Sequence, residues 1–158
     1  MEALFRSYLD VLRELSGVME RLTPLAQQKA EAVRASDLLA LDEVLKQEQA
    51  LSLNLRGLEL KRLKLAPQLG LDNVPLTKLH EHCPAQLTDE TRKTANALRE
   101  SYEIYCGYAN MARNTLELNL HQIDKALIDA GVDPKLAAQG YEAPPMEPPQ
   151  KMKTDFRA

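Results

Sequence analysis

The sequence predicts an all-α protein, an elongated antiparallel helical bundle or coiled coil of three long helices with short connecting helices. The 158-residue chain is rich in leucine but has only 4% aromatic residues, no Trp and six Gly, which suits helix bundles better than sheets. Apolar residues also recur every three or four positions along three long stretches, the spacing of one helix face. We expect residues 1–140 to form a single helical domain and residues 141–158 a flexible Pro-rich tail.

The first predicted helix begins near Glu2 and carries a wide apolar stripe. Its main row consists of Leu4, Tyr8, Val11, Leu15, Val18, Leu22 and Leu25. A second apolar row runs beside the first, and a stripe this wide buries against two neighbours, which favours a bundle over a simple two-stranded coil. Pro24 removes the hydrogen bond to the carbonyl of Glu20, and because the periodicity resumes at once we expect a kink rather than a new helix.

The second predicted helix follows a polar cap at Ser36 and Asp37 and runs to about Ala66. Its apolar row keeps the three-four step, but Glu48 and Arg62 take two of the positions. We expect these two side chains to reach out at the edge of the seam; the alternative is that they fix the register of the helices. A turn-rich connection follows, in which residues 76–83 could form a short helix.

The third predicted helix spans residues 88–130 and is roughly 60 Å long. Thr88 is expected to be its N-cap, and Gly131 ends it. Residues 104–112 carry no charge, so this section should be buried on most sides, with Gly107 permitting a close helix crossing. We expect the rest of the chain to be organised around this helix.

The long helix should reach beyond its neighbours by roughly ten residues, or about 15 Å, because the second helix and its turn can pair with only about thirty of its residues. If its start packs beside Leu65, the unmatched part holds Leu116, Leu120, Ile123 and Leu127. These four side chains are the predicted site for an amphipathic helix of a partner protein. The first helix, the turn after Asp133 or a second copy of the chain, as a homodimer, could cover them instead.

Composition argues against several other classes of protein. The formal net charge is −3, without the basic footprint of a nucleic-acid binder. The apolar runs fall far short of a membrane span, and the first residues are too polar for a signal peptide, so we expect a cytoplasmic protein without membrane insertion. Cys83 and Cys106 are most simply read as reduced thiols.

No motif points to an enzyme, a metal or a cofactor. His80, His82 and Cys83 form the only tempting ligand cluster, to which Cys106 and His121 could contribute, but zinc signatures need paired ligands at both ends of the site. There is neither a Gly-rich phosphate loop nor a recognisable nucleophile motif. We expect no catalytic or cofactor-binding site, and Tyr102, Tyr105 and Tyr108 are interpreted as core residues rather than an aromatic box.

Three segments resemble the FlgN family of bacterial flagellar export chaperones. The residues that carry the resemblance are Ala32, Asp37, Leu38, Leu41, Leu45, Glu48, Leu51, Leu55, Leu58, Glu59 and Arg62, then Asn110 and Asn114, and finally Asp155, Phe156, Arg157 and Ala158. The resemblance implies a cytoplasmic helical chaperone that holds hook-associated subunits, those of the hook-filament junction, and delivers them to the flagellar type III export apparatus. It also implies that the carboxy-terminal part of the chain contacts the subunit.

Together, the length argument and the resemblance assign subunit binding to the late long helix and the tail, with Tyr141 as an aromatic anchor that could equally serve docking at the export gate. Two alternatives stay open. One is an oligomeric structural coiled-coil protein without a client, and the other is an adaptor of another secretion system.

Overall fold

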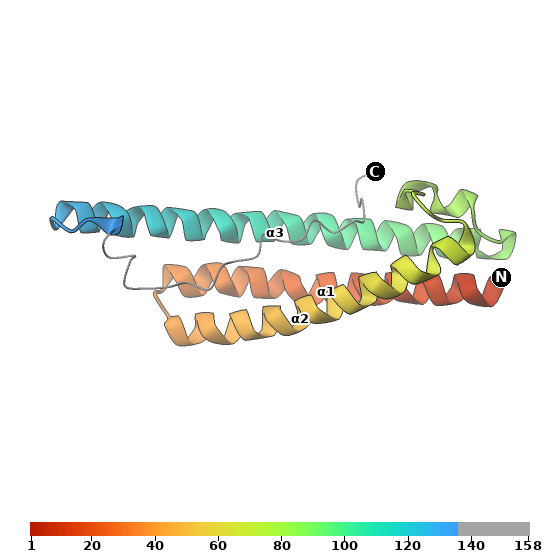
Figure 1. Cartoon of the computed structure of the whole chain (residues 1–158), viewed down its shortest axis with the longest axis horizontal. Coiled ribbons are helices and arrows are strands. Elements are labelled where there is room, and N and C mark those ends of the chain that lie inside the picture. The colour runs from red at the N-terminus through yellow and green to blue at the C-terminus, as the bar shows by residue number, and fades with distance from the viewer. Residues whose placement is uncertain (136–158) are drawn as a thin grey trace.

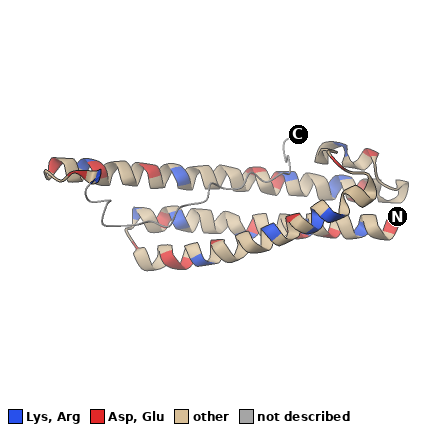
Figure 2. Cartoon of the chain, viewed as in Figure 1, with Lys and Arg blue, Asp and Glu red and all other residues tan. Residues whose placement is uncertain are grey.

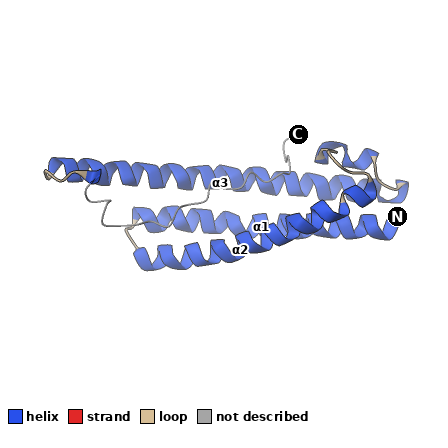
Figure 3. Ribbon diagram, viewed as in Figure 1, coloured by secondary structure: helices blue, strands red, loops and turns tan. Residues whose placement is uncertain are grey.

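The computed structural model describes residues 1–135 as a rod of three long helices (Figure 1). The long helices are α1 (Glu2–Arg34), α2 (Leu38–Leu65) and α3 (Thr88–Asp129), and the short 3₁₀ helices are η1 (Pro67–Leu69), η2 (Leu76–Glu81) and η3 (Ala85–Leu87). Within the described part of the chain there is no strand (Figure 3). Consecutive long helices run antiparallel, so α1 and α3 are parallel. The predicted fold class is confirmed, and residues 76–81 form the expected short helix.

The central element is α1, which packs against both α2 and α3. Its stripe is buried on two sides, from Phe5 and Leu9 through Leu12 and Leu15 to Val33. The prediction that the chain is organised around residues 88–130, with α2 paired along them, is therefore wrong. Only α1 has an apolar stripe wide enough for two neighbours, and α2 and α3 each place their narrower stripe against it.

The main core runs from the N-terminal end of the rod as far as Leu25 of α1 and Val44 of α2, and it is built from side chains of α1, α2, the connecting segment and the first part of α3. Tyr8, Leu12 and Leu15 of α1 meet Leu58 of α2 and Leu98 of α3 there. A second, smaller cluster of Ala26, Ala30 and Ala112 joins α1 to α3 further along. The core therefore becomes thin toward the end of α1 and stops where α1 stops.

The corner between α1 and α2 is made by local hydrogen bonds. The amide of Ser36 donates to the carbonyl of Val33 at 3.1 Å and that of Asp37 to the carbonyl of Ala32 at 2.9 Å, the Schellman pattern. Ser36 adopts a φ of 54°. The Asp37 side chain then accepts from the amide of Ala40 at 3.0 Å, so the predicted cap of the second helix is confirmed. α1 itself continues through Pro24 without a new start.

The polar residues on the seam of α2 bind α1 rather than reaching out to solvent. Lys29 Nζ of α1 lies 2.8 Å from Glu48 Oε1. Arg62 donates to Glu59 at 3.0 Å and to the Tyr8 hydroxyl at 3.3 Å. The expectation that Glu48 and Arg62 extend into solvent at the edge of the seam is thus wrong. The bonds to Lys29 and Tyr8 agree instead with the alternative that these residues fix the register of α2 against α1, because a shift of α2 by one turn would break both bonds.

Two predictions about α3 are also wrong. Thr88 is not its N-cap: η3 leads directly into the helix, Leu87 takes the cap position, and the Thr88 hydroxyl donates back to the Ala85 carbonyl at 3.0 Å. The acidic first turn instead contacts α1, where Glu90 pairs with Arg13.

The uncharged section 104–112 is not buried on most sides. Ile104 and Met111 are exposed, and no atom would lie within 4 Å of a Cβ at Gly107, so there is no close crossing there. The core reaches only one side of α3, because α1 is its principal neighbour. Tyr102, Tyr105 and Tyr108 lie on that side and are half-buried against the core clusters, as predicted.

Replacing Asp37 by Ala should lower the free energy of unfolding by about 1 kcal/mol, because the amide of Ala40 loses its side-chain acceptor. Urea unfolding followed by circular dichroism measures the change. Ser52→Ala, at an exposed position of α2, is the control and should change stability little. Equal stabilities of Asp37→Ala and the parent would show that the cap contributes nothing.

Burial raises the pKa of the Tyr105 hydroxyl above its ordinary value of 10.0, and the nearby charge of Glu48 adds to the shift. The folded state therefore retains this proton more strongly than the unfolded chain. Stability from this group is fully present below pH 10 and is lost as the pH rises through the raised pKa. As the pH rises above 10, the free energy of unfolding of Tyr105→Phe should therefore fall less steeply than that of the parent. Denaturant unfolding at several pH values measures this, and the same dependence on pH in both proteins would contradict the assignment.

Candidate binding surface on the end of helix α3

Helix α3 is longer than its neighbours, with 42 residues against 33 in α1 and 28 in α2. The Arg34 guanidinium, at the last residue of α1, lies 3.4 Å from the Thr115 hydroxyl of α3. Residues 116–129, which we call the α3 overhang, continue for about 20 Å past this contact. Figure 1 shows the overhang projecting beyond the corner between α1 and α2.

The four predicted contact residues of the long helix lie together on one face of the overhang. Leu116, Ile123 and Leu127 follow Ala112 by steps of four, seven and four, so they continue the face that is buried nearer the start of α3. Leu120 lies beside them. Leu120 is 60% exposed and Ile123 is 48% exposed, whereas Leu116 and Leu127 are half-buried. The surface is thus an apolar helix face that α1 and α2 are too short to cover.

The overhang ends in a C-terminal capping motif at Gly131. The amide of Val132 donates to the Leu127 carbonyl at 2.8 Å and that of Gly131 to the Ile128 carbonyl at 3.0 Å, with Gly131 at a φ of 77°. This Schellman motif commonly brings the residue after the glycine against the one five positions earlier, here Val132 and Leu127. Leu127 is half-buried at this turn, whereas Leu120 and Ile123, which lie further from it, are exposed.

Sequence reasoning missed other exposed leucines at this end of the rod. Leu38 and Leu39, the first two residues of α2, are 77% and 86% exposed at the corner from which the overhang projects. The signal was present for Leu39, which lies two residues before Leu41 and so on the other side of α2 from the buried row. Leu38 continues the three-residue step back from Leu41, so its position in the row gave no such signal. The predicted anchor Tyr141 and the predicted tail 141–158 lie outside the described residues.

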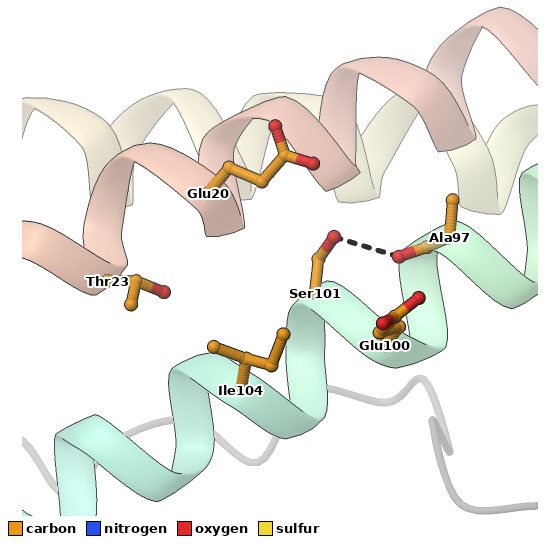
Figure 4. A pocket seen from close by; sticks show the side chains of 6 residues that line it. All are labelled: Glu20, Thr23, Ala97, Glu100, Ser101 and Ile104. Carbon is orange, nitrogen blue, oxygen red and sulfur yellow. Dashed lines mark hydrogen bonds between the residues drawn. The ribbon is translucent and has the colours of Figure 1, made fainter.

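A shallow groove lies between α1 and α3, nearer the start of α3 (Figure 4). Its lining consists of Glu20, Thr23, Ala97, Glu100, Ser101 and Ile104. The Ser101 hydroxyl donates to the Ala97 carbonyl at 2.8 Å and is therefore already satisfied. The Thr23 hydroxyl likewise donates to the Met19 carbonyl at 3.1 Å, so both hydroxyl groups of the lining are bonded to backbone carbonyls rather than to a carboxylate.

The residues considered for a metal do not assemble into a site. In residues 1–135, no three His, Cys, Asp or Glu side chains are placed to hold an ion. Cys83 and Cys106 are free and half-buried, and the Cys83 thiol donates to the His80 carbonyl at 3.2 Å. None of the described helices combines the length and hydropathy needed to cross a bilayer.

Truncating a buried and an exposed side chain on the same face of α3 should change the free energy of unfolding by very different amounts. Leu98→Ala should cost roughly 2–5 kcal/mol of unfolding free energy, because Leu98 is fully buried. Leu120→Ala combined with Ile123→Ala should leave the unfolding free energy and the helicity nearly unchanged. Chemical denaturation of the monomeric protein measures both, and a loss in the double variant comparable to that of Leu98→Ala would show that the overhang is ordinary core.

Comparison with known proteins identifies the chain as a whole. A sequence model of the FlgN protein family matches residues 1–128, which include α1, α2 and almost all of α3. Comparison with curated proteins and with solved structures gives no significant match. Because the family match covers most of the chain, the chain belongs to the FlgN family of flagellar export chaperones.

Proposed function

We propose that this protein is a cytoplasmic chaperone of flagellar type III export that binds hook-associated subunits through the α3 overhang and the C-terminal tail, keeps them from associating prematurely and aids their delivery to the export gate. The family membership supports the general role of an export chaperone. The observation that supports the site is the exposure of Leu120 and Ile123 on a helix face that is buried elsewhere in the same helix.

The proposed mechanism is the temporary covering of apolar surface. Subunits of a helical filament have terminal amphipathic helices whose apolar faces are packed only in the assembled polymer. In the free subunit these faces are exposed and prone to association. The α3 overhang offers a matching strip with the three-four spacing of a helix seam, so a subunit helix can pack on it as α1 packs on the earlier part of α3.

The size of the strip limits what it can do alone. Full burial of a Leu or Ile side chain contributes about 1.5–3 kcal/mol, and two of the four residues are already half-buried. Leu120 and Ile123 are themselves only about half exposed, so the strip offers on the order of 4 kcal/mol before the cost of association, less than the roughly 8 kcal/mol of a micromolar complex. This shortfall is why the proposal includes further contacts from the tail, with Tyr141 as the suggested anchor.

Replacing Leu120 and Ile123 by Ala should weaken capture of a purified hook-associated subunit by about tenfold or more, because the two most exposed members of the strip are lost. Calorimetric titration measures the affinity. The matched control is Leu118→Ala with Ile128→Ala, which removes two exposed apolar side chains from the other faces of the same overhang. Equal losses in the two double variants, or no loss in either, would refute the proposed site.

Light scattering across a range of protein concentrations tests the homodimer alternative in the same samples. The proposal expects a monomer whose overhang is available to the subunit. A stable dimer that dissociates in the Leu120→Ala, Ile123→Ala variant would instead assign the strip to self-association and favour an oligomeric structural protein.

A further inference from the structure

A second surface lies on α2, on the face turned away from α1. It consists of Leu53, Arg56, Gly57, Leu60, Lys61 and Lys64, which we call the basic-apolar face. Leu51 and Leu58 of the same helix are buried in the core, whereas Leu53 is 67% exposed and Leu60 is 54% exposed. Leu53 and Leu60 are seven residues apart, so they project from the same side of α2 two turns from one another. Among residues 1–135, the buried residues of α2 all lie on its other side.

Gly57 lies between the two leucines along the outer side of α2. Among residues 1–135, no other element would lie within 4 Å of a Cβ built there, so the helix is open at this point. A glycine inside a helix costs about 1 kcal/mol relative to alanine, and contact with α1 does not require it. With a leucine on each side, the missing side chain of Gly57 leaves the backbone of α2 accessible between two apolar side chains.

The cations around Gly57 have no ionic partners within the described part of the chain. Arg56, Lys61 and Lys64 are exposed and take part in no ion pair there. Other cations of α1 and α2 do pair, as in Lys29 with Glu48 and Arg62 with Glu59. Figure 2 shows basic residues along the C-terminal half of α2 and acidic residues near its start. The basic-apolar face is therefore a local positive surface on a chain whose net charge is −3.

We infer that the basic-apolar face docks an acidic amphipathic helix of a partner protein. Apolar side chains of that helix would pack on Leu53, Gly57 and Leu60, while carboxylates flanking them would reach the three cations. Charge decides against a second copy of this chain, because an interface centred on the two Gly57 residues would bring like-charged arginines and lysines together. The face is on α2 and the overhang is on α3, so the inference does not rest on the proposed subunit site.

The test uses the full-length protein and a synthetic stapled helix of about 20 residues with leucines at the three-four spacing and glutamates on the flanks. Fluorescence anisotropy should show binding that weakens as salt is raised, since exposed charges are screened. Arg56→Glu with Lys64→Glu should weaken it by about tenfold or more. Leu53→Ser with Leu60→Ser should also weaken it, without loss of helicity, because both leucines are exposed.

The matched control is Arg92→Glu with Lys93→Glu, the same change of charge on exposed residues of α3, which should bind the peptide like the parent. A peptide with lysines in place of the glutamates should not bind.

Equal weakening by the two charge reversals would overturn the inference, as would binding to vesicles containing phosphatidylglycerol but not to the peptide. If the parent protein is a dimer and the Leu53→Ser, Leu60→Ser variant is a monomer, the face binds a second copy of the chain and the inference is overturned. Capture of the hook-associated subunit should be unchanged in the α2 variants, so the two surfaces are tested separately.

Discussion

Helix α1 buries apolar side chains toward two neighbours along most of its length, and the arrangement of the other elements follows from this packing. α2 and α3 each have one narrower apolar stripe, and each places it against α1. Ion pairs and hydrogen bonds to α1 then set their positions along the rod, from Lys29 with Glu48 and Tyr8 with Arg62 on α2 to Arg13 with Glu90 on α3. The bonds between α1 and α2 are partly buried and serve register better than stability, because removing the charges from water offsets much of their attraction, whereas the Arg13–Glu90 pair is exposed.

The length of α1 also sets where the core ends. Beyond Arg34 the bundle has no central helix, whereas α3 continues to Asp129 without a change in the spacing of its apolar residues. The same face of α3 is therefore core at Leu98 and open surface at Ile123. A chaperone needs apolar surface that is exposed yet held in a defined conformation, and extending a core helix beyond its neighbours provides this without a special motif.

The two candidate surfaces differ in chemistry. The α3 overhang is apolar, with mixed charges around it, and suits a partner helix that is recognised by packing. The basic-apolar face of α2 has fewer apolar residues and three cations, and suits a partner that is recognised by charge as well. Because they lie on different helices, the proposed subunit site and the inferred docking face do not overlap.

The sequence by itself determined what depends on neighbouring residues along the chain. The 3.6-residue periodicity predicted three long helices and their approximate ends, Asp37 and Gly131 predicted the cap and the stop, and the count of residues predicted that α3 reaches beyond its neighbours. Tertiary structure alone decided which helix is central, that Ile104, Gly107 and Met111 face outward, and that Glu48 and Arg62 bind α1. The physical reason is that spacing shows which residues share a face of a helix, whereas burial depends on which faces of other helices are wide enough to cover it.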